Sequence, residues 1–111
     1  MGHRPSNTQY FAEEPDSPGH TPVYVREGDS GDPEEIDQRQ DLRNHSPDGF
    51  SWGYSGSGSA QLALAVLADH YDDDQRAMDQ YMDFKREFVA QYSGDAPFYA
   101  TAADIRDVCG Y

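Results

Sequence analysis

Arg43 and His45 are the first residues with chemical potential, because they precede a run of alternating serine and glycine at residues 55–59. A Ser/Gly loop that leads into a helix presents free backbone N–H groups and the positive end of the helix dipole. Together these attract phosphate or carboxylate. Arg43 is a natural anion clamp, and His45 is a candidate acid or base. We therefore predict a site for a small anionic ligand, such as phosphate or a nucleotide, that comprises Arg43, His45, Trp52, Ser55, Gly56, Ser57, Gly58 and Ser59.

An alternative interpretation gives the same residues a purely structural role. The run lacks the Gly-Lys-Ser/Thr ending of a nucleotide P-loop, and its glycines do not have the spacing of the dinucleotide fingerprint. In this interpretation the glycines form a tight turn that lets a buried helix begin close to an aromatic segment. Arg43 then pairs with a local carboxylate, and His45 packs against Trp52.

Other chemistries find little support in the sequence. The acidic segment 69–74 has the composition of a hard-cation site, but it straddles an expected helix end, so its carboxylates point in different directions. Cys109 is the only cysteine, and no base is identifiable beside it. The serine run also lacks the spacing of a lipase-type nucleophile elbow. We expect no metal, no cofactor and no catalytic residue, although an enzyme that uses His45 stays open as an alternative.

Two helices must position this loop. Leucines, valine and alanines cover almost all sides of a helix over 60–71, which predicts a buried helix with Ser57 or Ser59 as its N-cap. Methionines and aromatic residues recur at three- and four-residue steps over 75–92, which predicts an amphipathic helix. Only Asp72, Asp73 and Asp74 separate the two, so we expect an antiparallel hairpin.

Extended segments complete the predicted domain. Residues 21–26 have strand composition, 36–43 is a weaker extended piece, and the aromatic residues at 50, 52 and 54 alternate as on one face of a strand. A short strand at 98–99 precedes a capping-box pattern and a helix over 102–108. The fold class is α+β: an antiparallel helix hairpin on a small β or extended region, with a short C-terminal helix. We expect a disordered acidic tail over 1–20 and a single domain over 21–111.

The charge balance is strongly acidic. The 111 residues include 21 Asp and Glu against eight Lys and Arg, for a formal net charge of −13, and Lys85 is the only lysine. Such a surface repels itself in dilute buffer and is tolerated in molar salt, where the screening length falls to about 3 Å. The pattern is typical of halophilic archaea; an acidic mesophilic protein is the alternative. The chain has no basic stripe for nucleic acid and no apolar run long enough for a membrane span, so we expect a cytoplasmic location.

Residues 41–65 read DLRNHSPDGFSWGYSGSGSAQLALA, and Phe84-Lys85 follows in the second helix. This segment resembles the core signature of a family catalogued as domain of unknown function 6166, whose members carry a similar RNHSP-GF-WGY-GSG-AQLAL pattern and a later FK pair. Ser59 stands where the family usually has proline, and Ser51 replaces an acidic residue. Similar proteins occur in bacteria, haloarchaea and their mobile elements. The resemblance implies no activity and assigns no catalytic residue.

These observations favour a non-enzymatic interaction or accessory module of archaeal or mobile-element origin. Its partner is expected to be a protein, rather than nucleic acid or a membrane. Binding of a small anion at the Ser/Gly loop is the alternative function. The sequence does not indicate an oligomeric state.

Overall fold

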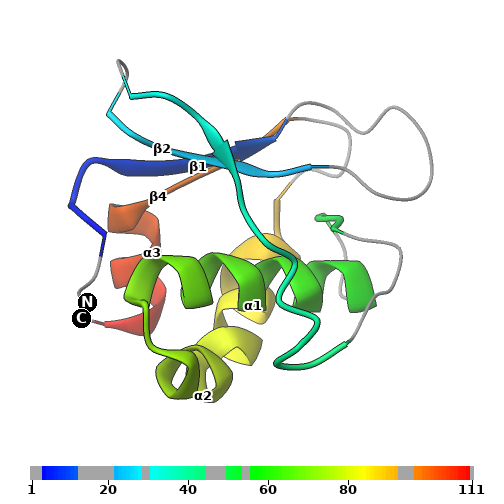
Figure 1. The fold of residues 1–111 in the computed structure, drawn as a ribbon. Helices are drawn as coiled ribbons and strands as arrows, with labels where there is room; N and C mark the ends of the chain where they lie inside the picture. Colours follow the sequence, from blue (N-terminus) through cyan, green and yellow to red (C-terminus); the bar gives the residue numbers. More distant parts are fainter. Residues whose placement is uncertain are drawn as a thin grey trace.

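The computed structural model describes residues 4–12, 22–28, 31–44, 50–53, 56–92 and 97–110. Its strands form one antiparallel sheet in the order β3-β2-β1-β4. Figure 1 shows the helices together on one side of this sheet. The predicted α+β class is therefore confirmed. The elements are β1 (Thr8–Ala12), β2 (Tyr24–Glu27), β3 (Glu34–Glu35), α1 (Ser57–Tyr71), α2 (Asp74–Phe84), the π-helical turn η1 (Lys85–Val89), β4 (Phe98–Thr101) and α3 (Ala102–Cys109).

Strand β1 corrects our expectation for the N-terminal segment. We predicted a disordered tail over 1–20, but Thr8–Ala12 is an inner strand that pairs with both β2 and β4. Its alternate residues, among them the fully buried Tyr10, face the helices. The segment contains only two large apolar residues, so its sequence gives a weak strand signal, and its stability comes from two long-range partners. Residues 1–3 and 13–20 of the predicted tail lie outside the described residues.

Helix α1 is the centre of the core. Every residue from Gly58 to Ala68 is buried, because the helix lies between the sheet and α2 and is apolar on nearly all sides (Figure 1). The helix begins three residues earlier than predicted. Its N-cap is Gly56, which offers no side-chain cap, so the prediction of Ser57 or Ser59 as cap was wrong.

Helix α2 confirms the second predicted helix but not its regularity. The Asp73 carboxylate accepts a hydrogen bond from the Arg76 backbone N–H at 3.1 Å and caps the start. The helix then widens into η1, where the Ala90 N–H donates to the Lys85 carbonyl at 2.8 Å. Phe84 and Phe88, on either side of this change, stack with ring centroids 5.3 Å apart.

The C-terminal helix confirms its predicted capping box. Thr101 Oγ1 accepts from the Asp104 N–H at 3.2 Å, and an Asp104 carboxylate oxygen accepts from the Thr101 N–H at 2.9 Å. In the part of the chain that the structure describes, no helix is both long and apolar enough to cross a membrane.

Candidate functional site

The start of α1 lies directly against residues 50–53. A Cβ atom added to Gly58 would come within 2.1 Å of the Ser51 hydroxyl oxygen, and the Ser51 N–H donates to the Gly58 carbonyl at 3.3 Å. Ser59 is completely buried in the same turn. Glycine at position 58 is therefore a packing requirement of the helix start, whether or not a ligand binds nearby.

Trp52 belongs to the core in this structure. Its side chain is only 3% exposed, and its ring lies 5.5 Å from that of Phe98. The next residue, Gly53, donates its backbone N–H to the Val89 carbonyl at 3.0 Å. These contacts attach the aromatic segment to η1 and β4, so Trp52 offers no open ring face to a ligand.

Within the part of the chain that the structure describes, the other predicted ligand-binding residues do not come together in a site. Ser57 is exposed and Gly56 is half-buried at the helix start. Arg43 is exposed, and its side chain makes no hydrogen bond or ion pair with another described residue. His45 and Ser55 lie outside the described residues, as does Tyr54 of the alternating aromatic residues. An anion site at this loop therefore stays a prediction.

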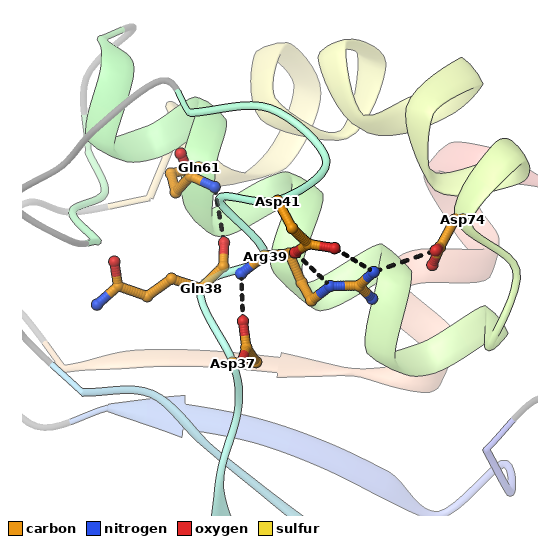
Figure 2. Close-up of polar contacts among 6 residues, drawn as sticks. All are labelled: Asp37, Gln38, Arg39, Asp41, Gln61 and Asp74. Carbon is orange, nitrogen blue, oxygen red and sulfur yellow. Dashed lines mark hydrogen bonds and ion pairs between the residues drawn. The ribbon is translucent and has the colours of Figure 1, made fainter.

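A strap formed by residues 36–44 crosses from the sheet to the helices, where Arg39 anchors it (Figure 2). Arg39 Nε and one terminal nitrogen contact the two Asp41 carboxylate oxygens at 3.0 and 3.1 Å, and the same nitrogen reaches Asp74 at 3.1 Å. Its backbone N–H donates to Asp37 at 2.7 Å. Hydrogen bonds with Asp41 and then Asp74 raise the pKa of Arg39, and Arg39 lowers the pKa of Asp41. Arg39 has a φ of 54°, a left-handed conformation that this network holds.

Gln61 provides a second attachment for the strap from inside the core. Its side chain is fully buried in α1, and its Nε2 donates to the Gln38 carbonyl at 2.6 Å (Figure 2). The role of Gln61 was not predicted from the sequence. The available signal was a lone amide within an otherwise apolar helix, since a buried polar side chain needs a partner.

The acidic residues at the α1–α2 junction have separate structural roles. Asp69 accepts hydrogen bonds from Arg4 at 2.8 and 3.0 Å and from the Tyr10 hydroxyl at 2.7 Å. Asp73 caps α2, and Asp74 pairs with Arg39. Within the described ranges, no group of three or more His, Cys, Asp or Glu residues is placed to hold a metal ion.

Cys109 lies in partly buried surroundings at the end of α3. Burial raises the pKa of its thiol above the usual value, although the adjacent Tyr71 and Arg76 act in the opposite direction. The thiol form therefore dominates near neutral pH, which disfavours nucleophilic chemistry at this residue.

The outer face of the sheet carries aromatic residues from three neighbouring strands. Phe11 of β1 lies in register with Tyr24 of β2 on one side and with Tyr99 of β4 on the other. The alternation of the strands places these three aromatic residues on the face away from the helices (Figure 1). We call this set, Phe11, Tyr24 and Tyr99, the aromatic row.

Arg26 completes this face. Its guanidinium carbon lies 4.9 Å above the Phe11 ring, and its Nε donates to the Gln9 amide oxygen at 2.7 Å. The Phe11 and Tyr24 rings lie 5.8 Å apart, while Tyr99 is 42% exposed at the edge strand. A planar cation held above an aromatic ring restrains both the Arg26 and the Phe11 side chains.

The sequence model of a family of unknown function (DUF6166) matches residues 19–110 of the chain. This range includes the strap, all helices and three of the four strands, and β1 precedes it. No curated protein and no solved structure matches the chain.

Proposed function

The chain belongs to this family of unknown function, DUF6166, and we propose that it is a non-enzymatic interaction module that binds a protein partner through the aromatic row. The observation that supports this proposal most directly is the register of Phe11, Tyr24 and Tyr99 across three neighbouring strands. Adjacent strands lie about 4.8 Å apart, so the row spans roughly 10 Å of continuous aromatic surface.

Aromatic residues and arginine are the side chains most enriched in the centres of protein interfaces. The row combines three of the former with Arg26. It spans the two inner strands, β1 and β2, and the edge strand β4, whose intervening residues are buried in the core. The side chains of the row therefore lose little conformational entropy when a partner binds. Affinity then follows from this pre-organisation more than from the buried surface area.

The charge pattern favours a protein over a nucleic acid as the partner. Exposed Glu35 lies in register with Tyr24 at one end of the row, and the whole chain carries a formal net charge of −13. Phosphate backbones need a basic surface, whereas Arg26 is the single cation among the described strand residues that neighbour the row. We further propose that the protein acts in the cytoplasm of a halophilic host and is of archaeal or mobile-element origin. In such a host, molar salt screens the repulsion between two acidic proteins.

A pair of matched variants tests the row. Tyr99→Ser removes an exposed aromatic residue from the row, whereas Met82→Ser removes a side chain of nearly equal exposure, 44%, from α2, a helix that α1 separates from the sheet (Figure 1). Immobilised wild-type protein and both variants are exposed to host extract in molar KCl, and bound proteins are quantified by mass spectrometry. We expect a partner that wild type and Met82→Ser retain and Tyr99→Ser loses.

Two outcomes would contradict the proposal. One is that no protein is retained by wild type at molar salt; the other is that both variants lose the same proteins to the same extent. If wild type retains nucleic acid and Tyr99→Ser does not, the partner is a nucleic acid and the proposed protein partner is wrong. Sedimentation of the purified chain is the companion measurement, because a dimer abolished by Tyr99→Ser would identify the partner as a second copy.

A further inference from the structure

Strand β1 supplies the centre of the aromatic row. Its alternate residues have different roles: Phe11 lies between Tyr24 and Tyr99 on the outer face, whereas Tyr10 is completely buried on the face toward the helices. Among the described strands, β2 and β4 each pair with β1 and not with each other. The row is therefore continuous only while β1 occupies the position between them.

This central ring comes from outside the family-matched part of the chain. The matched range, residues 19–110, contains Tyr24, Arg26 and Tyr99 but begins after β1. Phe11 also supports the Arg26 guanidinium, whose carbon lies 4.9 Å above the ring. The N-terminal segment, residues 4–12, thus adds to the family domain both the middle of the row and the support of its cation.

Asp69, in the last turn of α1, holds the N-terminal segment from the other side of the sheet. Its two carboxylate oxygens accept hydrogen bonds from Arg4 at 2.8 and 3.0 Å, and one of them also accepts from the Tyr10 hydroxyl at 2.7 Å. Burial and then Asp69 raise the pKa of Tyr10, so its hydroxyl keeps the proton that it donates. One side chain thus binds both the start of the segment and its strand.

The contacts of Asp69 are of a kind that persists in molar salt. The Arg4 and Asp69 side chains are only 27% and 22% exposed, and partly buried ion pairs are screened less than surface pairs. Two parallel hydrogen bonds from one guanidinium add to the strength of the pair. Without the carboxylate, the buried Tyr10 hydroxyl would lose its acceptor, which is costly inside a protein.

We propose that the N-terminal segment docks on the family domain to assemble the partner-binding surface, and that Asp69 is the positioning residue for this docking. The inference rests on the proposed binding of a protein partner through the aromatic row. A partner that contacts all three rings binds only the docked state, so its apparent affinity falls with the docked fraction of the segment. Asp69 therefore influences partner binding without touching the partner, because α1 covers the opposite face of the sheet (Figure 1).

Matched variants of two ion-paired aspartates test this docking in the full chain. Asp69→Ala removes the contacts with Arg4 and Tyr10. Asp74→Ala removes an equal charge and the 3.1 Å ion pair with Arg39 of the strap, and it leaves the contacts of β1 intact. A general effect of lost charge or lost stability would therefore appear in both variants.

Hydrogen exchange and NMR in molar KCl report on the segment directly. In Asp69→Ala, the amides of residues 9–12 should exchange about tenfold faster or more, which corresponds to the loss of one charged hydrogen bond. The Nε–H signal of Arg26 should shift as well, because its side chain lies against the Phe11 ring only while β1 is docked. Asp74→Ala should show neither change.

Partner retention tests the coupling between Asp69 and the row. Both variants are immobilised and exposed to host extract in the same way as Tyr99→Ser. Asp69→Ala should lose the partner whose binding depends on Tyr99, whereas Asp74→Ala should retain it. Tyr10→Phe removes only the hydroxyl and should give the same changes in smaller measure, so it replaces Asp69→Ala if that variant does not fold.

Three results are decisive. Unchanged exchange at residues 9–12 in Asp69→Ala and Tyr10→Phe, or equal acceleration in Asp74→Ala, would overturn the docking role of Asp69. Faster exchange with full retention of the partner would overturn the coupling to the row. If wild type retains no partner through Tyr99, the proposed function fails, while the exchange rates and the Arg26 signal still decide whether Asp69 positions the segment.

Discussion

The side-chain amide of Gln61, buried in α1, donates a 2.6 Å hydrogen bond to the backbone carbonyl of Gln38 in the strap. This bond connects the core helix to the strap, which follows β3 and contains no helix or strand. Together with the Arg39 network it fixes the path of the strap over the helices. The position of this polar residue inside an apolar helix is thus explained by its hydrogen bond to the strap and not by a catalytic role.

Gln61→Met keeps the side-chain length but removes the donor. We expect a loss of about 1–3 kcal/mol in the free energy of unfolding, because the Gln38 carbonyl loses its partner and the core loses a specific contact. Chemical denaturation in molar KCl measures this loss, and amide exchange at Leu42 should accelerate because the strap loosens. Gln75→Met is the control, since its exposed amide bonds Asp79 on the surface at 3.0 Å. It should change stability by less than about 0.5 kcal/mol.

Gly58→Ala tests the close approach at the start of α1. Alanine normally stabilises a helix over glycine by about 1 kcal/mol. Here its Cβ would lie 2.1 Å from the Ser51 hydroxyl oxygen and 3.1 Å from the Ser51 backbone nitrogen. We expect the steric cost to exceed the propensity gain, with a net destabilisation of roughly 1–3 kcal/mol.

The double variant Gly58→Ala/Ser51→Gly provides the control for this interpretation. It removes the hydroxyl that the new methyl group meets, so part of the lost stability should return. A thermal-unfolding cycle of the four proteins measures the coupling. If Gly58→Ala alone is as stable as wild type, the glycine has no packing role, and a ligand-binding role becomes the better explanation of the Ser/Gly run.

The sequence predicted the helices well because their signals are local. The apolar residues of α1, the aspartates before α2 and the Thr101–Asp104 box each act within one or two turns. It did not predict β1, since the strand character of Tyr10 depends on pairing with β2 and β4, far away in the chain. For the same reason the sequence did not predict the aromatic row, whose three members come from segments separated by more than ten residues.

The Ser/Gly run illustrates a different limit. Its residue types suit both anion binding and tight packing, and spacing alone does not distinguish the two. The structure gives Gly58 a packing role through Ser51 and places Trp52 in the core.

Tyr71 provides a pH-dependent stability test. Burial, aided by the neighbouring Cys109, raises the pKa of Tyr71 to about 12, above the value of about 10 in an unfolded chain. Between pH 10 and 12 the unfolded state loses the phenol proton first, so the free energy of unfolding falls as the pH rises. Below pH 10 both states keep the proton, and this contribution is constant.

Tyr71→Phe lacks this titration. Relative to wild type, its free energy of unfolding should improve by roughly 1–2 kcal/mol between pH 9 and pH 11.5. Urea denaturation at both pH values measures the difference, with Tyr99→Phe as the exposed control. An unchanged difference between wild type and Tyr71→Phe would show that the phenol titrates normally in the folded protein.

The excess of carboxylates predicts a stability that depends on salt. With a formal net charge of −13, the folded chain repels itself more than the expanded unfolded chain does. Raising KCl from 0.2 to 2 M shortens the screening length to a few ångströms and should raise the melting temperature of wild type by several degrees. Differential scanning calorimetry over a KCl series measures this slope.

Substitution at two exposed aspartates, Asp32 and Asp107, separates charge from other effects of salt. Asp32→Asn/Asp107→Asn lowers the negative charge by two, and Asp32→Lys/Asp107→Lys lowers it by four. If repulsion causes the salt dependence, the slope should be largest in wild type, smaller in the asparagine variant and smallest in the lysine variant. Equal slopes would show that salt acts on apolar burial instead, because that contribution does not depend on the charges at these positions.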